Sequence, residues 1–356
     1  MAGCTNLKTF SIHAPELKNL TTTTFSETGS TSPITELNLS TPNCAINWSS
    51  LNTQCPNITD LTIDVLHQGY VGNSLGNTIL PNLETLNINL SSQNNNLTQL
   101  VSSRKQSLLS NININFPLKS SIKANFSNSF SGIYYKNNSP TQTTINLTND
   151  GYMQFINGAS MFSGSTGVTN ITGLDKRIFF TDSSYAFTYC QYLKKLAISD
   201  MRYCENCTNM FKMSTLGSTS TAADWSQLQN LTINNDTDIS LGASNPDKYN
   251  EIVGTPMWKC KIATSDANNE IDFSACHFKY AQPLQAMAEA MANYIHCYEF
   301  LKNDISDSEI ISYIKLPPNM ISHLTTLNAI DAANVLYTKE VEYGDRKSTI
   351  KIKVKS

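Results

Sequence analysis

The sequence is poor in charged residues, and this limits the partners that can be expected. Lys, Arg, Asp and Glu make up 15% of the 356 residues, against roughly 25% in average soluble domains. Asn, Ser and Thr fill the difference, and the net charge is -3. A chain without an excess of positive charge has no electrostatic reason to bind nucleic acid or an anionic membrane surface. We therefore predict that nucleic acid is not a partner.

Long apolar runs are also missing. No run approaches the roughly 18 apolar residues that a bilayer-spanning helix needs, which predicts that the chain does not insert into a membrane. The segment from Met1 to Leu7 lacks the charged and apolar parts of a signal peptide. Either a leader has been removed or export uses another route.

The usual signatures of cofactor chemistry are absent or incomplete. The segment Gly158 to Gly164 is the nearest candidate for a phosphate-binding loop, and it lacks the Lys that such a loop requires. Cys204-x-x-Cys207 has zinc-ligand spacing, but no second pair of ligands follows at a suitable distance. The nine cysteines are an odd number scattered along the chain, which is typical of small buried side chains rather than a disulfide framework. We predict no metal and no cofactor.

Histidine and cysteine stand side by side at Cys276-His277 and at His296-Cys297. A nucleophile and its base meet in space and not by adjacency in sequence, so these pairs do not predict an active site. His296 falls late in an expected helix, where a cation is favoured by the helix dipole. We predict no catalytic residues.

What the chain does contain is a repeated L-x-x-L-x-L rhythm. The first five copies begin at Leu7, Ile34, Ile58, Leu83 and Leu109. The steps between them are 27, 24, 25 and 26 residues, inside the range of about 20 to 29 residues for leucine-rich repeats. Each copy predicts a short strand stacked in parallel on the next, because one repeat cannot bury its apolar face alone. Polar residues beside the apolar ones, such as Thr9, Ser11, Thr85 and Asn87, are expected to face outward.

A second signature lies on the other side of the repeat. Apolar pairs recur 25 and 24 residues apart, at Met161-Phe162, Ala186-Phe187 and Met210-Phe211. The continuous segment Ala186-Phe-x-x-Cys190-x-x-Leu193-x-x-Leu196-x-Ile198 resembles the BspA-like leucine-rich repeats of bacterial surface proteins, and residues 2–12 are similar to the later part of the same unit. The resemblance covers roughly residues 2 to 320. It implies an α/β leucine-rich-repeat solenoid of about eleven repeats, with parallel strands on the concave face and short turns or helices on the convex face.

The expected organisation is a solenoid over 1–334 with irregular insertions at about 90–150 and 235–265, followed by a capping hairpin over 335–356. A helix is predicted from Pro283 to Tyr298, because apolar residues recur on one helical face. Strand-like runs at 335–343 and 348–354 predict the hairpin. Its second run alternates Ile and Val with Lys, which suits an exposed edge strand. The sequence contains no capping segment before the first repeat, so the apolar end of that repeat is expected to be uncovered by this chain. We therefore expect that the chain is a piece of a larger protein or that a partner chain covers this end.

Five charged residues are the candidates for contact with a partner on the concave face: Lys8, Glu36, Asp60, Glu84 and Lys195. Glu36 and Asp60 each come two residues after the first apolar position of a repeat, so they are expected to be neighbours on adjacent strands. Two such acids suit the acid and base of a sugar-cleaving enzyme, or a cation site, or a solvated surface. Tyr134, Tyr135, Tyr152 and Phe155 are either core residues of irregular repeats or contact residues on a rim.

The function predicted from these features is non-enzymatic recognition or adhesion, with a protein or glycan at a cell surface as the partner. This expectation follows from the family resemblance and agrees with the polar, weakly charged composition. The alternative is a fibre or tail-associated, structural or receptor-binding component of a bacteriophage, in which case the chain belongs to a virion. A polysaccharide-cleaving enzyme is the third possibility. The predicted location is extracellular.

Overall fold

The structure is a computed structural model that describes residues 6–18, 31–65, 70–134 and 143–199, with short gaps. Beyond these it describes 203–204, 206, 210, 230–234, 270–272, 284–285, 288–289, 292, 309–343 and 346–356. The chain divides into two compact units, Met1–Thr181 and Asp182–Ser356. Each unit is built mainly of parallel strands with few helices, so the predicted α/β class is confirmed.

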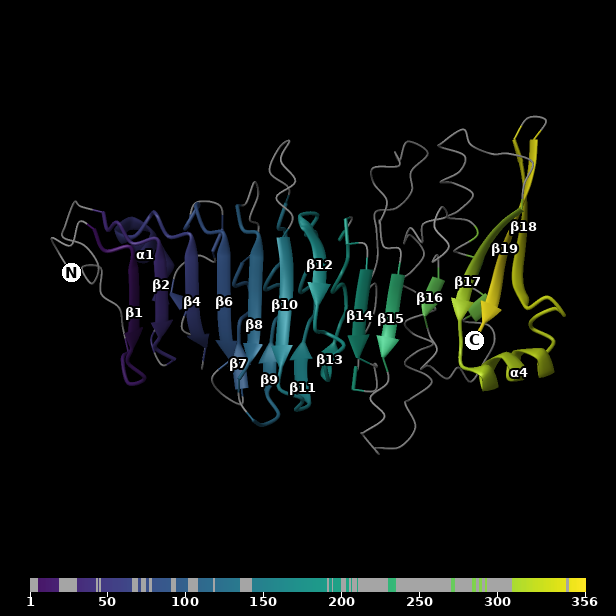
Figure 1. The fold of residues 1–356 in the computed structure, drawn as a ribbon, viewed down its shortest axis with the longest axis horizontal. Coiled ribbons are helices and arrows are strands. Elements are labelled where there is room, and N and C mark those ends of the chain that lie inside the picture. Colours follow the sequence, from purple (N-terminus) through teal and green to yellow (C-terminus); the bar gives the residue numbers. More distant parts are fainter. Residues whose placement is uncertain are drawn as a thin grey trace. The chain divides into compact units, whose positions relative to one another are not determined.

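The first unit contains a seven-stranded parallel sheet in which the strands follow one another in chain order (Figure 1). The strands are β1 (Thr9–His13), β2 (Glu36–Ser40), β4 (Asp60–Val65), β6 (Thr85–Leu90), β8 (Asn111–Phe116), β10 (Thr143–Asn149) and β12 (Val168–Thr172). Each of the five predicted copies of the rhythm forms one strand of this sheet. Strands that stack in this way leave the sheet open, which is compatible with a solenoid.

Alternation along each strand separates a buried face from a polar face. Leu61 and Ile63 on β4 pair in register with Leu86 and Ile88 on β6, and all four side chains are fully buried. The residue between each apolar pair faces the other way, because successive side chains of a strand point to opposite sides. On β6 that residue is Asn87, which is half-buried. The predicted outward positions are therefore confirmed.

The entry to each strand explains why two residues, and not one, separate the first two apolar positions. The N–H groups of Thr35 and Glu36 both donate to the carbonyl oxygen of Lys8, at 2.9 and 3.1 Å. One repeat later, the N–H groups of Thr59 and Asp60 both donate to the carbonyl oxygen of Thr35, at 2.8 and 3.0 Å. Two successive residues thus occupy one ladder position, and the apolar residues on both sides of them face the core.

A second parallel sheet of four short strands completes the first unit. Its order is β13 (Ile178–Asp182), β11 (Gln154–Asn157), β9 (Lys123–Asn125) and β7 (Asn94–Asn96). β9 and β11 run in the opposite direction to β8 and β10 (Figure 1), as expected of a chain that returns after each strand of the first sheet. The sequence predicts turns or helices here, because strands of three to five residues leave too few positions for a visible alternation. The described residues of the segment 90–150 include the strands β7, β8, β9 and β10.

Short elements follow β2 and β4 in the chain: β3 and helix α1 come after β2, and β5 comes after β4. β3 (Ile46–Asn47) pairs with β5 (Tyr70–Val71). Helix α1 (Trp48–Gln54) starts at Asn47, whose side chain accepts a 2.9 Å hydrogen bond from the N–H of Ser50. An Asn that satisfies a free N–H at the first turn stabilises the start of a helix. Trp48 and Leu51 are the buried apolar residues of this helix.

Aromatic rings and one glycine mark the core of the later repeats. The ring centroids of Phe126 and Phe130 lie 5.9 Å apart, and those of Phe130 and Phe162 are stacked at 5.8 Å. Gly173 has a φ of +89°, and a Cβ added there would lie 2.0 Å from the carbonyl oxygen of Leu147. Only glycine fits this position, which directly follows β12, because any side chain would collide with the backbone of Leu147 on β10.

The second unit contains a six-stranded sheet. Its order is β14 (Lys195–Ser199), β15 (Asn230–Asn234), β16 (Glu270–Asp272), β17 (Glu309–Lys315), β19 (Arg346–Lys355) and β18 (Val335–Tyr343). All neighbours are parallel except β18 and β19, which are antiparallel. Helix α4 (Pro318–Thr326) follows β17 and buries Met320 and Leu324. Pro318 stands in its first turn, where a missing N–H removes no hydrogen bond.

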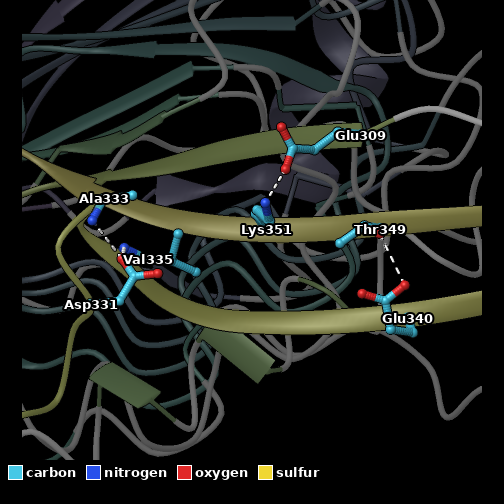
Figure 2. Close-up of polar contacts among 7 residues, drawn as sticks. All are labelled: Glu309, Asp331, Ala333, Val335, Glu340, Thr349 and Lys351. Carbon is cyan, nitrogen blue, oxygen red and sulfur yellow. Dashed lines mark hydrogen bonds and ion pairs between the residues drawn. The ribbon is translucent and has the colours of Figure 1, made fainter.

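The predicted C-terminal hairpin is present, but its edge strand is the other one. β19 lies between β17 and β18, so β18 forms the edge of the sheet. The lysines of β19 alternate with buried Ile350, Ile352 and Val354 because they lie on the opposite face of an inner strand. Figure 2 shows that Lys351 pairs with Glu309 of β17 and that Thr349 donates to Glu340 of β18 at 2.9 Å. Asp331 accepts from the N–H groups of Ala333 and Val335, both at 2.8 Å, and so orders the entry to β18.

Two expectations fall mainly outside the described residues. The predicted insertion at 235–265 lies entirely outside them. In the predicted helix from Pro283, the described residues Leu284, Ala288 and Ala292 are helical and buried, whereas Gln285 and Glu289 are exposed. Among the residues that the structure describes, no helix has the length and apolarity needed to cross a bilayer.

Candidate functional site

The outward surface of the seven-stranded sheet carries three rows of polar side chains, which together we call the polar face. Within a row, each residue pairs in register with its neighbour on the next strand, except that Ser40 and Asp64 are joined by a side-chain hydrogen bond. The first row is Thr9, Glu36, Asp60, Thr85, Asn111, Thr144 and Asn170. The middle row is Ser11, Asn38, Thr62, Asn87, Asn113, Asn146 and Thr172. The Asp64 row is His13, Ser40, Asp64, Asn89, Asn115 and Thr148.

Side-chain hydrogen bonds run along the middle row. Asn146 Nδ2 donates to Asn113 Oδ1 at 3.0 Å, and Asn113 Nδ2 donates to Asn87 Oδ1 at 2.8 Å. The series ends with Asn87 Nδ2 donating to Thr62 Oγ1 at 3.1 Å and begins with Thr172 Oγ1 donating to Asn146 at 2.9 Å. Strands about 4.8 Å apart bring amides of equal length into contact, so identical residues in register form a ladder.

The Asp64 row is connected in the same way, and its bonds converge on one carboxylate. Thr148 donates to Asn115, whose Nδ2 donates to Asn89 Oδ1 at 2.8 Å. Asn89 Nδ2 then donates to Asp64 Oδ1 at 2.8 Å. From the other side, Ser40 Oγ donates to Asp64 Oδ2 at 2.6 Å. Bonds to an ionised acceptor are roughly twice as strong as bonds between neutral groups, so Asp64 anchors the row.

His13 extends this row beyond Ser40. Its Nδ1 lies 2.8 Å from Ser40 Oγ. Ser40 has one proton and gives it to Asp64, so the His13 ring must donate at Nδ1. In a catalytic triad the histidine stands between the serine and the acid and removes the serine proton. Here the serine stands between them, so His13 is not placed to activate Ser40, and the arrangement holds the side chains in position.

The structure brings two of the five predicted contact residues together. Glu36 and Asp60 are direct register partners on β2 and β4, as predicted. Glu36 Oε2 accepts a 3.1 Å bond from Thr9 Oγ1, and Asp60 Oδ2 accepts a 2.7 Å bond from Thr59 Oγ1. Each acid is thus oriented by a neighbouring hydroxyl group.

The other three predicted residues are not register partners of this pair. Lys8 and Glu84 are exposed, and each stands one residue before its strand, at the ladder position where two N–H groups share a carbonyl. They are out of phase with Glu36 and Asp60 and are separated from each other by the strands of two further repeats. Lys195 is exposed at the first position of β14, in the second unit. The five residues therefore do not form one cluster.

The asparagine rows are the feature that the sequence reasoning did not single out. Asn87 was expected to face outward, but its bonding to Asn113 and Asn146 was not foreseen. A signal for it exists, because N-x-N patterns recur at Asn87-Ile-Asn89 and Asn113-Ile-Asn115, 26 residues apart. Equal residues at equal phase in a repeat predict a ladder once the repeat length is known.

The chemistry of the polar face is that of amides and hydroxyl groups. The seven strands contain no Lys or Arg, and their acidic residues are Glu36, Asp60 and Asp64. Apart from these three carboxylates, which lie on β2 and β4, the face offers neutral donors and acceptors at a constant spacing. Because the side chains are already bonded to one another, little conformational freedom remains to be lost on binding. It suits an uncharged partner that is rich in hydroxyl or amide groups.

The described cysteines are not part of the polar face. Cys44, Cys55, Cys190 and Cys204 are buried thiols that form no disulfide, as predicted. Burial raises the pKa of the Cys55 thiol to about 11, although a hydrogen bond with Ser32 acts in the opposite direction. Cys204 Sγ lies 3.3 Å from Ser183 Oγ, and burial raises its pKa as well. The second cysteine of the C-x-x-C pair, Cys207, is outside the described residues.

In the described part of the chain, no group of three or more His, Cys, Asp or Glu side chains is placed so that it could hold a metal ion. Tyr134 and Tyr152 are 38% and 42% exposed, whereas Phe155 is half-buried with its ring 6.2 Å from that of Phe179. The predicted aromatic group is thus divided between surface and core, and Tyr135 is outside the described residues.

Comparison of the whole chain with family models, curated proteins and solved structures gives no match.

Proposed function

We propose that the chain is a leucine-rich-repeat recognition module of an extracellular surface protein and that it binds its partner without catalysing a reaction. The strands that follow the L-x-x-L-x-L rhythm support the repeat assignment. The similarity of Ala186 to Ile198 to BspA-like repeats supports the surface location. The polar face is the proposed contact surface, with a glycan or a polar protein segment as the partner.

The observation that carries the proposal is the pair of hydrogen-bonded rows across the polar face. A solvated surface of Asn and Thr does not need its side chains to bond to one another. In the middle row, Asn87, Asn113 and Asn146 each use both the oxygen and the nitrogen of the amide for neighbours. Each amide nitrogen carries a second proton and each oxygen a second lone pair, and these remain for a partner in a fixed geometry.

The test is a binding screen followed by one matched pair of variants. An array of glycans and surface proteins is screened with the full chain, and the best binder is titrated against Asn113→Ala and Asn82→Ala. Asn82 is an exposed Asn of the same unit that lies outside the polar face, and it donates to the carbonyl oxygen of Pro56 at 3.1 Å. Both variants therefore lose one amide, but Asn82→Ala loses one hydrogen bond to a neighbouring repeat, whereas Asn113→Ala loses two, one to the repeat on each side.

We expect Asn113→Ala to weaken binding by about five- to tenfold, which corresponds to roughly 1 kcal/mol. Asn82→Ala should bind within about twofold of the natural protein. Equal affinities of the two variants would show that the polar face is not the contact surface.

The adjacent pair Glu36 and Asp60 supports a second candidate function, polysaccharide cleavage. Retaining and inverting glycosidases use two carboxyl groups about 5 to 9 Å apart, and register partners on neighbouring strands fall near the lower end of that range. Release of reducing sugar from a polysaccharide, abolished by either Glu36→Gln or Asp60→Asn, would establish this activity. Binding without any release, unchanged in both variants, would leave recognition as the function.

A further inference from the structure

The turn at residues 182–190, in the second unit, repeats an arrangement found three times in the first unit. Asp182 Oδ1 accepts hydrogen bonds from the N–H and the hydroxyl group of Ser184, at 2.8 and 2.7 Å. In the first unit, Asn96 accepts from the N–H of Thr98, Asn125 from that of Ser127, and Asn157 from that of Ala159. The four turns therefore have the same start.

Each of the later turns also contains left-handed positions at fixed places. The third residue after the Asn or Asp has a positive φ: 57° at Asn128, 54° at Ser160 and 56° at Tyr185. Four residues later the backbone is left-handed again, with a φ of 70° at Gly132, 71° at Gly164 and 57° at Tyr189. The turn thus requires two residues with positive φ.

Tyrosine is an unfavourable choice for both positions. A left-handed conformation brings Cβ close to the neighbouring carbonyl oxygen, and bulky side chains adopt it rarely. In the first unit the first position holds Gln99, Asn128 or Ser160, and the second holds Gly132 or Gly164. Gly and Asn adopt the left-handed conformation most readily, and no turn of the first unit has an aromatic residue at either described position. The turn itself therefore does not require Tyr185 or Tyr189, and the two side chains need another explanation.

Both tyrosines are exposed on a turn that is otherwise buried. Tyr185 is 42% exposed and Tyr189 is 41% exposed. The other six residues from Ser183 to Cys190 are all buried. The two rings are thus the surface that this turn presents to solvent, since the remaining side chains of the turn pack inward.

We propose that Tyr185 and Tyr189 form an aromatic contact site for a neutral saccharide. A phenol ring offers an apolar face for the C–H groups of a sugar ring and a hydroxyl group for its polar edge. The exposed area of the two side chains is on the order of 200 Å², well short of the roughly 800 Å² that each partner contributes to a stable protein interface. The turn has one charged residue, Asp182, and its Oδ1 is occupied by Ser184, so no charge is required of the ligand.

This site is independent of the polar face, because it consists of different residues in the other compact unit. The two surfaces can therefore be tested separately. The residues found at the matching positions of the turn at 157–165 supply a variant that the fold already accepts. The double substitution Tyr185→Ser and Tyr189→Gly copies Ser160 and Gly164 into the turn.

The experiment uses the full chain and neutral hexasaccharides of glucose, mannose and galactose, with binding followed by calorimetric titration. We expect at least one of them to bind and the double variant to bind it at least tenfold more weakly, because tyrosines are typical of residues that dominate a contact. The thermal midpoint of the double variant should not fall, since two bulky left-handed residues have been replaced by ones that fit. A lower midpoint would contradict the reading of the turn.

The control variant is Tyr152→Ser, which removes an equally exposed tyrosine from the first unit. It should keep the natural affinity. The site would be refuted by failure of all the neutral hexasaccharides to bind, by unchanged binding in the double variant, or by binding only of anionic saccharides. Measuring Asn113→Ala in the same assay separates this outcome from the polar-face proposal, because each variant removes one surface and leaves the other intact.

Discussion

Asn89 Nδ2 donates to Asp64 Oδ1 at 2.8 Å, and this contact sets the direction of a whole row of side chains. An ionised carboxylate can only accept hydrogen bonds. The amide of Asn89 must therefore point its nitrogen at Asp64 and its oxygen at Asn115, and the amide of Asn115 must follow. One charged residue thus orients neutral amides on two further strands.

The first prediction concerns the proton on His13. The substitution Asp64→Asn gives the row an amide whose oxygen can face Asn89 and whose nitrogen can face Ser40. Ser40 then accepts from that amide and no longer gives its proton to residue 64, so it can donate to His13 Nδ1. We therefore expect the ring proton to move from Nδ1 to Nε2 in the neutral ring. Nitrogen NMR of the labelled ring detects the change. Asp60→Asn, on the same strand but without a bond to Ser40, should leave the His13 tautomer unaltered.

The second prediction separates steric conflict from backbone strain. Gly173 and Gly151 have nearly equal φ angles, +89° and +91°, but a Cβ at Gly173 would meet Leu147 whereas one at Gly151 would meet nothing within 4 Å. We expect Gly151→Ala to lower the free energy of unfolding by about 1 kcal/mol. Gly173→Ala should lower it by about 3 kcal/mol, because strand β12 must also move away from β10. Urea denaturation measures both, and similar losses would contradict the close approach.

The third prediction follows from the raised pKa of Cys55. The folded-state pKa is about 11 and the ordinary value is 9.0. Below pH 9 the thiol is therefore protonated in both the folded and the unfolded state, and its ionisation does not reduce the free energy of unfolding. Between pH 9 and 11 only the unfolded chain loses the proton, and stability should fall by about 2 to 3 kcal/mol at most. Cys55→Ala should show a smaller fall over the same window. Denaturation curves at pH 8, 9, 10 and 11 provide the comparison, and parallel falls in both proteins would exclude Cys55 as the cause.

The fourth prediction concerns the acidic pair. Like charges directly opposite each other on neighbouring strands are destabilising, so Glu36→Gln should raise the free energy of unfolding by a few tenths of a kcal/mol at low salt. The gain should disappear in 1 M salt, where the Debye length falls to about 3 Å. Glu84→Gln is the control, because Glu84 is exposed but out of phase with the pair. An equal gain in both variants would point to the net charge of the chain and not to the pairing.

The parallel strands could be predicted because the repeat is visible in the apolar residues themselves. Leu37, Leu61 and Leu86 recur at near-constant spacing and pair in register, and the neighbour relation of Glu36 and Asp60 follows from the same phase. The second sheet could not be predicted, because β7 is Asn94-Asn95-Asn96 and its residues carry no apolar alternation. β7 pairs through its backbone with β9, a strand of a later repeat, and the side chains of β7 give no sign of this pairing.

The side-chain arrangement of the polar face could be predicted less well than the strands, for a physical reason. Charged residues such as Lys8 and Glu84 stand out in a weakly charged sequence, but they occupy strand entries and do not converge. The bonded rows consist of Asn, Ser and Thr, which are common throughout this chain and are distinguished only by their phase. The exposure of Tyr185 and Tyr189 could likewise not be predicted, because nothing in the sequence indicates that these two residues have a left-handed backbone conformation.

The amide rows have one further consequence. In both rows every asparagine on β6, β8 and β10 turns its nitrogen toward the strand that precedes it in the chain. Along each row, the amide nitrogens therefore all point in the direction of β4 and the amide oxygens all point in the direction of β12. A linear ligand laid across the strands meets two inequivalent orientations, so the surface can distinguish the head of a polymer from its tail.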